Sequence, residues 1–482
     1  MLDSRQQDTT RLTTGKTIIK NFLSLALSNV VSKLLIFLSF VAIARVLGPA
    51  YFGKINFAQA IMLYFLIITH LGLSLFGTRE IAHNRKAVKQ YVNDIVSLRI
   101  ILTVISIAAM TAVSFLVTSQ TDTRALIILF GLSLLPTALY FDWVFKGLES
   151  MEFIGITEVV RATALFLLLK FFISTQRNLL LVPVFFVISA TIATSILYII
   201  YARRINRFRF TFNISRGKQL LKTALPLGLS LIMIQVYCQL GTVVLGLLKG
   251  DTAVGWFNAA YKVVLFIIGF ASLFVDAIFP VISRYHKRSQ SDLSRFSNII
   301  TKIAVTFAMP LAILTTIYAP KIVNVLYGAQ YMPCVIILQI MIWTTAVIVV
   351  SMTFGNSLIA CNGERQYFKG VAIGAIINVV LTLVLTQTMG YVGTSIAMLV
   401  TEISVITYMI FKYMKIVRIY IERYVLKAGI AAFPMTIVAL LSRNNLGVSI
   451  AVSLTVYALS FVAIRGISRV DIQLAKYYFR GK

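Results

Sequence analysis

Long apolar segments, separated by short polar ones, run through the whole chain and constrain its fold more than any other feature. A membrane-spanning helix needs about 20 consecutive apolar residues, and fourteen of them would take up roughly 280 residues. The chain has 482 residues, of which 59% are hydrophobic and only 13% are charged, whereas soluble proteins carry about 25% charged residues. The apolar residues exceed what a water-soluble core could bury, so we predict a polytopic membrane protein.

The apolar segments are predicted to be helices, because they lack the ten-residue alternation of membrane β-strands and each must satisfy its own backbone groups. The fold class is therefore all-α, with about fourteen transmembrane helices predicted and twelve as the main alternative. The predicted spans are 18–44, 56–76, 95–118, 125–145, 157–175, 180–201, 220–248, 257–283, 297–319, 333–356, 370–388, 393–411, 426–442 and 448–464.

Basic residues are concentrated in the short loops. The chain has 45 Lys and Arg against 16 Asp and Glu, a formal net charge of +29. Clusters between apolar runs follow the positive-inside rule and argue against a nucleic-acid partner. With the N-terminus inside, about 30 Lys and Arg fall in cytoplasmic segments and about 7 outside. We therefore expect both termini in the cytoplasm.

Several classes of function find no support in the sequence. The loops leave no room for a nucleotide-binding domain, and no GxxxxGK[ST] phosphate loop occurs. The three cysteines form neither a disulfide framework nor a metal motif. His70, alone near the inner end of the second span, is interpreted as a packing residue. We predict no catalytic residues, no metal and no cofactor, so the protein is not expected to be an enzyme.

The chain matches itself, weakly but without gaps, at a shift of 202 residues. Gly48 and Asn56 fall on Gly250 and Asn258, so that in both places a long helix ends in a glycine-containing outer turn. Six spans separate the copies, which predicts two parallel repeats that rock around a shared site. The predicted domains are an N-lobe at 1–201, a basic cytoplasmic linker at 202–219, a C-lobe at 220–411, and two further helices with a basic cytoplasmic tail at 412–482.

Charged side chains inside the spans each need a partner, a wet cavity or a function, because a charge at the bilayer centre costs several kcal/mol. Glu158 and Arg161 are expected to pair along one helix, and Asp142 to cap or pair at the inner interface. The remaining excess is basic, and Arg99 is among these intramembrane charges. An anionic cargo would require such an excess.

Polar residues accompany the unexplained charges. Lys33 lies beside a stripe of serines, and Gln235 and Gln239 form a polar stripe on the helix before Lys262. Another polar stripe contains Gly374, Asn378 and Thr382. Arg45, beside the Gly-Pro turn at the outer mouth, is either an interface anchor or a contact for a diphosphate.

Three stretches near the N-terminus resemble a known family: Ala-Arg-Val-Leu-Gly-Pro-Ala-Tyr-Phe-Gly at 44–53, Phe-Ala-Gln-Ala at 57–60 and Gly-Thr-Arg-Glu at 77–80. They are similar to the opening of the polysaccharide-exporter (Wzx-type O-antigen flippase) family, within the multidrug/oligosaccharidyl-lipid/polysaccharide superfamily. The segments 254–262, 277–283 and 390–397, with Glu402, continue the resemblance over nearly the whole chain.

The resemblance implies two six-helix lobes around a central cavity and two extra C-terminal helices in a bacterial inner (plasma) membrane. It further implies that an undecaprenyl-pyrophosphate-linked oligosaccharide moves from the inner to the outer leaflet. In O-antigen and lipopolysaccharide biosynthesis, a membrane polymerase and a chain-length regulator are the partners it would imply besides the lipid bilayer. A cation-coupled multidrug antiporter of the same superfamily is the alternative, but it would favour an acidic, aromatic-lined cavity.

The candidate site residues follow from these considerations. Substrate binding is predicted for Lys33, Arg45, Lys262, Gln235, Gln239, Asn56 and Asn258. Ion coupling is predicted for Asp276 or Glu402. We expect the basic residues to attract the pyrophosphate, while one of the two acids exchanges protons.

Overall fold

The computed structural model describes residues 2–211, 213–442 and 445–466, with side chains from residue 27 onward except those of residues 227, 230 and 231. In this part of the chain the regular secondary structure is helical and contains no strand, as predicted. The predicted basic C-terminal tail extends past residue 466, and from there it lies outside the described residues.

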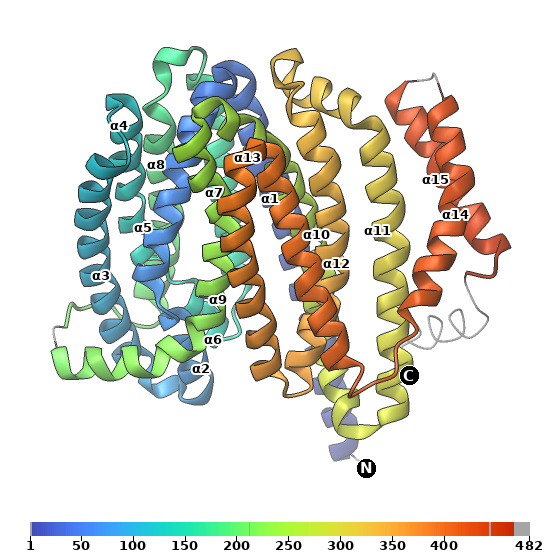
Figure 1. Cartoon of the computed structure of the whole chain (residues 1–482). Coiled ribbons are helices and arrows are strands. Elements are labelled where there is room, and N and C mark those ends of the chain that lie inside the picture. The colour runs from blue at the N-terminus through green and yellow to red at the C-terminus, as the bar shows by residue number, and fades with distance from the viewer. Residues whose placement is uncertain (1, 212, 443–444, 467–482) are drawn as a thin grey trace. The chain divides into compact units, whose positions relative to one another are not determined.

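The helices follow one another through short connections (Figure 1). The N-terminal half contains α1 (Leu2–His70), α2 (Leu73–His83), α3 (Val88–Val117), α4 (Thr121–Leu132), α5 (Leu134–Ala138), α6 (Asp142–Gly147), α7 (Glu152–Phe172), α8 (Leu181–Arg204) and α9 (Ile214–Lys249). The C-terminal half contains α10 (Asp251–Arg288), α11 (Gln290–Tyr327), α12 (Cys334–Ala360), α13 (Glu364–Tyr413), α14 (Ile421–Leu441) and α15 (Leu446–Ala463).

Eleven helical segments of the described chain are long and apolar enough to cross a membrane. Two of them are interrupted by a glycine with a non-helical backbone, Gly48 in α1 and Gly390 in α13, and each therefore supplies two spans. The 21-residue α7, which carries the Glu158 and Arg161 charges, is a further helix of spanning length. Counted in this way, the helices agree with about fourteen spans, and the chain is a multi-pass membrane protein.

Contacts divide the chain into two compact units, Met1–Gly255 and Trp256–Lys482. In the first unit, α1 packs against α3, α4, α7 and α9, and α2 packs against α6 and α9. In the second unit, α12 packs between α11 and α13, and α14 and α15 form a pair beside α11. The hydroxyl of Tyr318 in α11 donates a 3.1 Å hydrogen bond to the carbonyl of Ala439 in α14, which fixes the C-terminal pair to this unit.

Two glycine turns in the first unit have the same backbone conformation. Gly48 has φ 80° and ψ 172°, and Gly250, 202 residues later, has φ 81° and ψ 177°. Such a positive φ is readily adopted by glycine alone among common residues. The turn therefore recurs at the shift that the sequence repeat predicts.

The same two turns also pack against each other. A Cβ atom placed on Gly53 would lie 1.8 Å from the carbonyl oxygen of Asp251, and one placed on Gly255 would lie 1.9 Å from the carbonyl oxygen of Pro49. Both positions need a glycine, because a backbone carbonyl lies where the Cβ atom of any other residue would be. A shift of 202 residues turns one contact into the other, as an approximate twofold axis would. We call these two contacts the glycine seam.

Helix α9 consists of a crosswise start and a long second part. Its first turns lie crosswise to α3 (Figure 1), and Pro226 follows them inside the helix, where a proline produces a kink. Beyond this point α9 runs along the second limb of α1. There the Tyr64 hydroxyl donates a 2.8 Å hydrogen bond to the carbonyl of Val236, and a Cβ atom on Gly228 would lie 2.8 Å from the backbone nitrogen of Gly72.

Candidate functional site

Two acids that the sequence predicts to pair with nearby residues, Glu158 and Asp142, each form an ion pair. Arg161 Nη2 lies 2.7 Å from Glu158 Oε2 on α7, and Lys146 Nζ lies 2.7 Å from Asp142 Oδ2 on α6. The hydroxyl of Tyr140 donates a further 2.7 Å hydrogen bond to Glu158 Oε1. Both predictions are confirmed, and these acids have structural partners that explain their presence.

The predicted site residues on α1 differ in exposure. Lys33 is half-buried, whereas Arg45 is exposed near the Gly48 turn. Asn56 is buried, and its Nδ2 atom donates a 2.7 Å hydrogen bond to the carbonyl of Phe52 in its own helix. In this conformation the Asn56 amide therefore stabilises α1.

In the second unit, four predicted residues lie on α10 and α13. Lys262 is half-buried and Asp276 is exposed on α10, whereas Asn258 on the same helix and Glu402 on α13 are buried. Lys262 and Asp276 are fourteen residues apart on one helix, about 21 Å along its axis. They therefore act at different depths and do not form a pair.

The polar stripe of α13 lies between the two limbs of that helix. Asn378 Nδ2 donates a 3.1 Å hydrogen bond to Thr401 Oγ1, and Thr382 Oγ1 donates one of 3.4 Å to Asn378 Oδ1. A Cβ atom on Gly374 would lie 2.3 Å from Val405 Cγ2. The small and polar residues of this stripe therefore hold the two limbs together, a common use of such residues in membrane helices.

A cavity of about 360 Å³ lies in the first unit, between the end of α1, the start of α2 and the second part of α9. Most of its wall is aliphatic. His70 and Ser74 form a polar corner in this wall, and Gln235 also lines the cavity, nearer to Leu63. Gln235, one of the predicted substrate-binding residues, thus lines a cavity together with a histidine that the sequence did not assign to a site.

Arg99 of α3 lies directly behind His70. The arginine is 0% exposed, and its Nη2 atom lies 3.3 Å from His70 Nδ1 and 3.2 Å from His70 Nε2. The same Nη2 atom donates a 2.6 Å hydrogen bond to the carbonyl of Thr137, and Nη1 donates one of 3.5 Å to the carbonyl of Tyr140. On its other side, His70 Nδ1 lies 3.3 Å from Ser74 Oγ. Arg99 thus supports the polar corner from within the protein.

The charge of Arg99 is only partly compensated. Among the described residues, no carboxylate oxygen lies within 4 Å of its guanidinium, and its Nε atom has no hydrogen-bond partner. An arginine keeps its charge in proteins, and low-dielectric surroundings screen that charge weakly. The Asp142 carboxylate, which is paired with Lys146, attracts the guanidinium from beyond 4 Å. The buried guanidinium still adds a positive charge behind His70, which suits an anionic group.

The sequence does not reveal this pair, because His70 and Arg99 lie on different helices, 29 residues apart. His70 does pack against its neighbours, as predicted, but one of them is a buried cation. The available signal was an arginine within an apolar span that has no acid three or four residues away on its helix. That pattern marks a charge whose partner must come from elsewhere.

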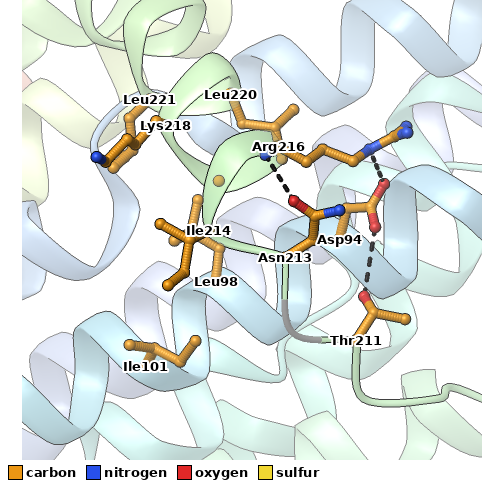
Figure 2. A pocket seen from close by; sticks show the side chains of 11 residues that line it. Asp94, Leu98, Ile101, Thr211, Asn213, Ile214, Arg216, Lys218, Leu220 and Leu221 are labelled. Atoms are coloured by element: carbon orange, nitrogen blue, oxygen red, sulfur yellow. Dashed lines mark hydrogen bonds and ion pairs between the residues drawn. The ribbon is translucent and has the colours of Figure 1, made fainter.

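A smaller cavity of about 200 Å³ lies where the basic linker meets α3, and Figure 2 shows the side chains that line it. Asp94 of α3 lies between two linker groups, with Arg216 Nε at 2.5 Å and the Thr211 hydroxyl at 3.3 Å. Asn213 begins α9 by accepting a 3.0 Å hydrogen bond from the backbone N–H of Arg216. These contacts tie the linker to the start of α3.

Replacing Asp94 with alanine is expected to loosen the linker. Trypsin added to the purified protein in detergent should then cleave the arginine-rich segment 202–211 about two to five times faster than in wild type, as expected for a partly exposed ion pair. Glu149→Ala, which breaks the exposed 2.6 Å pair with Arg85, is the matched control and should leave this cleavage unchanged. Equal rates for Asp94→Ala and wild type would show that the pair does not hold the linker.

Comparisons with known proteins give a consistent result. The family model described as "Polysaccharide biosynthesis protein" matches residues 18–286. A protein of Escherichia coli (strain K12) named "Putative O-antigen transporter" is 25% identical over 403 residues, which cover 81% of this chain and 95% of that protein. The Staphylococcus aureus protein named "Capsular polysaccharide biosynthesis protein CapF" is 21% identical over 400 residues, covering 82% of this chain and 99% of the relative.

Solved structures show the same helical architecture. "Lipid II flippase MurJ, inward closed conformation" matches with a TM-score of 0.76 at 15% identity, over 92% of this chain and 98% of that chain. An inward-facing transporter of the MATE family and the MOP superfamily matches with a TM-score of 0.65 at 16% identity, over 80% and 94% of the two chains. At such identities the likeness establishes the fold alone, and it confirms the predicted all-α membrane fold.

Proposed function

Since the chain belongs to the polysaccharide biosynthesis protein family, we propose that it is a flippase for an oligosaccharide linked to undecaprenyl pyrophosphate. The cargo moves from the cytoplasmic leaflet to the outer leaflet of the inner membrane. The family resemblance noted in the sequence is confirmed by the family match and by the MurJ- and MATE-like fold. Relatives and structural neighbours named as transporters or flippases support a role in transport.

The observation that carries the proposal is the basic character of the protein at membrane depth. Arg99 is fully buried, with no carboxylate within 4 Å of its guanidinium in the described chain, and Lys33 and Lys262 are half-buried in spanning helices. These groups attract a diphosphate and repel an organic cation. The multidrug antiporter alternative therefore has only the shared fold in its favour.

The transport route follows from the insolubility of sugar in hydrocarbon. A polar headgroup needs a wet cavity that opens alternately to each side, while the lipid tail stays in the bilayer. We assign the pyrophosphate to Lys33, Arg45 and Lys262, and the sugar hydroxyls to Gln235, Gln239, Asn56 and Asn258. Of these residues, Gln235 lines the larger cavity.

Ion coupling is assigned to Asp276 or Glu402. A carboxyl group that exchanges protons at membrane depth can bias a transport cycle, and Glu402, 5% exposed in α13, lies inside the protein. We also place both chain termini in the cytoplasm because the basic loops lie on that side. A membrane polymerase and a chain-length regulator would then receive the flipped unit on the outer face.

Replacing Lys262 with alanine is expected to abolish export while the protein remains in the membrane. Loss of a charged contact with the pyrophosphate should reduce transport at least about tenfold. The measurement is surface polysaccharide in a strain that lacks its own flippase, with membrane abundance determined in parallel. Lys170→Ala, an equal change of charge at an exposed position of α7, should export normally. Normal export by the Lys262 variant would remove this residue from the site.

A further inference from the structure

We propose that the 360 Å³ cavity beside His70 is an additional subsite that holds the phosphate end of the carrier lipid and its first isoprene units. This inference rests on the proposed function and adds a place for the lipid part of the cargo. Among the residues that line this cavity, Gln235 alone was a predicted substrate contact.

The polar corner supplies what a phosphate needs. A phosphate oxygen placed there accepts a hydrogen bond from the His70 ring nitrogen that carries the proton. The Arg99 amino group, 3.2 Å and 3.3 Å from the two ring nitrogens, holds the imidazole and adds a buried positive charge behind it. Hydrogen bonds to an ionised group are about twice as strong as neutral ones, so this corner favours an anion over a neutral polar group.

The rest of the cavity suits a branched hydrocarbon. Leu63, Leu66, Ile67 and Leu75 come from α1 and α2, and Ile232 comes from α9. The volume of about 360 Å³ is within the usual range of small-molecule sites, and it accommodates the end of a lipid but not an oligosaccharide as well. Most of the oligosaccharide therefore remains outside this subsite, and only its first sugar can reach Gln235.

The depth of the subsite favours the carrier lipid over ordinary phospholipid. The crosswise start of α9, with exposed Lys218 and Lys222, has the basic face of a helix that lies in the interface, and Asp94 binds it through Arg216. Arg99 is five residues further along α3, about 7.5 Å deeper. A phospholipid phosphate rests in the headgroup layer, so a phosphate at His70 has already been drawn towards the membrane interior.

Binding of undecaprenyl diphosphate without sugar tests the subsite. Native mass spectrometry of the purified full chain should show that His70→Ala binds this probe at least about tenfold more weakly than wild type. His70→Gln, which keeps an N–H donor, should remain within about threefold of wild type. His83→Ala, a change at an exposed histidine of α2, is the matched control and should bind normally.

Competition separates the sources of the phosphate. An equal concentration of phosphatidylglycerol should leave the probe bound, and equal displacement would overturn the proposal by showing a general phospholipid site. Wild-type affinity in His70→Ala would also overturn it. Flipping assayed on the same preparations distinguishes the two levels of inference. If wild type binds the probe through His70 but does not flip the cargo, the proposed function is refuted and the subsite is not. If wild type flips the cargo and His70→Ala binds the probe normally, the subsite is refuted and the proposed function is not.

Discussion

A valine at Gly53 is expected to leave little folded protein in the membrane and no transport. Its Cβ atom would lie 1.8 Å from the carbonyl oxygen of Asp251 and 3.0 Å from the backbone nitrogen of Gly255. Both obstacles are backbone atoms, so no change of rotamer relieves the clash and the glycine seam must open. We expect a cost at or above the upper end, about 3 kcal/mol, of the usual penalty for overpacking.

The approximate symmetry of the seam provides a second test of the same clash. Gly255→Val should fail in the same way, because a Cβ atom on Gly255 would lie 1.9 Å from the carbonyl oxygen of Pro49. Gly429→Ala is the control, since nothing lies within 4 Å of a Cβ atom at this position of α14. It should be neutral or stabilise by about 0.5–1 kcal/mol, because alanine favours a helix interior. Membrane abundance and thermal unfolding in detergent measure all three. A Gly53 variant with wild-type values would show that the seam is not closely packed.

Replacing Arg99 with methionine is expected to abolish transport without loss of stability. A buried charge with incomplete compensation is often replaced by an apolar side chain of similar volume at no cost, or with a gain. The unfolding temperature should therefore stay the same or rise, while flipping falls more than tenfold because the positive charge behind His70 is lost. Arg99→Lys should give an intermediate rate, since one ammonium group cannot reach His70 and the carbonyls of Thr137 and Tyr140 together.

The control for Arg99 is Arg177→Met, which removes an exposed arginine and should leave both flipping and stability unchanged. Full transport by Arg99→Met would show that the buried charge has no part in moving the cargo. An unfolded Arg99→Met protein would show instead that the guanidinium is a structural tie between α3 and the carbonyls of Thr137 and Tyr140 at the end of α5.

The fold could be predicted from the sequence because the hydrocarbon layer sets a minimum length for apolar helices. The boundaries could not be predicted, since α10 and α11, at 38 residues each, extend well beyond the apolar segments that marked them. Hydropathy marks only the part of a helix that lies in lipid. The turns at Gly48 and Gly250 were predictable because the 202-residue repeat places a glycine at the end of a long helix in both copies.

The site was less predictable because side-chain partners come from different helices. The Glu158–Arg161 pair follows from helical spacing, whereas the contact between Arg99 and His70 depends on how α3 packs against α1. Small polar residues are ambiguous for a related reason. The stripe that contains Asn378 has the composition of a cavity wall, but it lies in the contact between two limbs of one helix. Composition alone does not separate these two uses.

Flipping by the purified protein in liposomes is the most direct test of the central claim. A fluorescent oligosaccharide linked to undecaprenyl pyrophosphate is placed in one leaflet, and the sugar that reaches the other face is measured with a membrane-impermeant quencher. We predict that wild type exposes the sugar at least about tenfold faster than Lys262→Ala or protein-free liposomes do. The claim would be contradicted if wild type exposed the sugar no faster than protein-free liposomes do and the same preparation took up an organic cation.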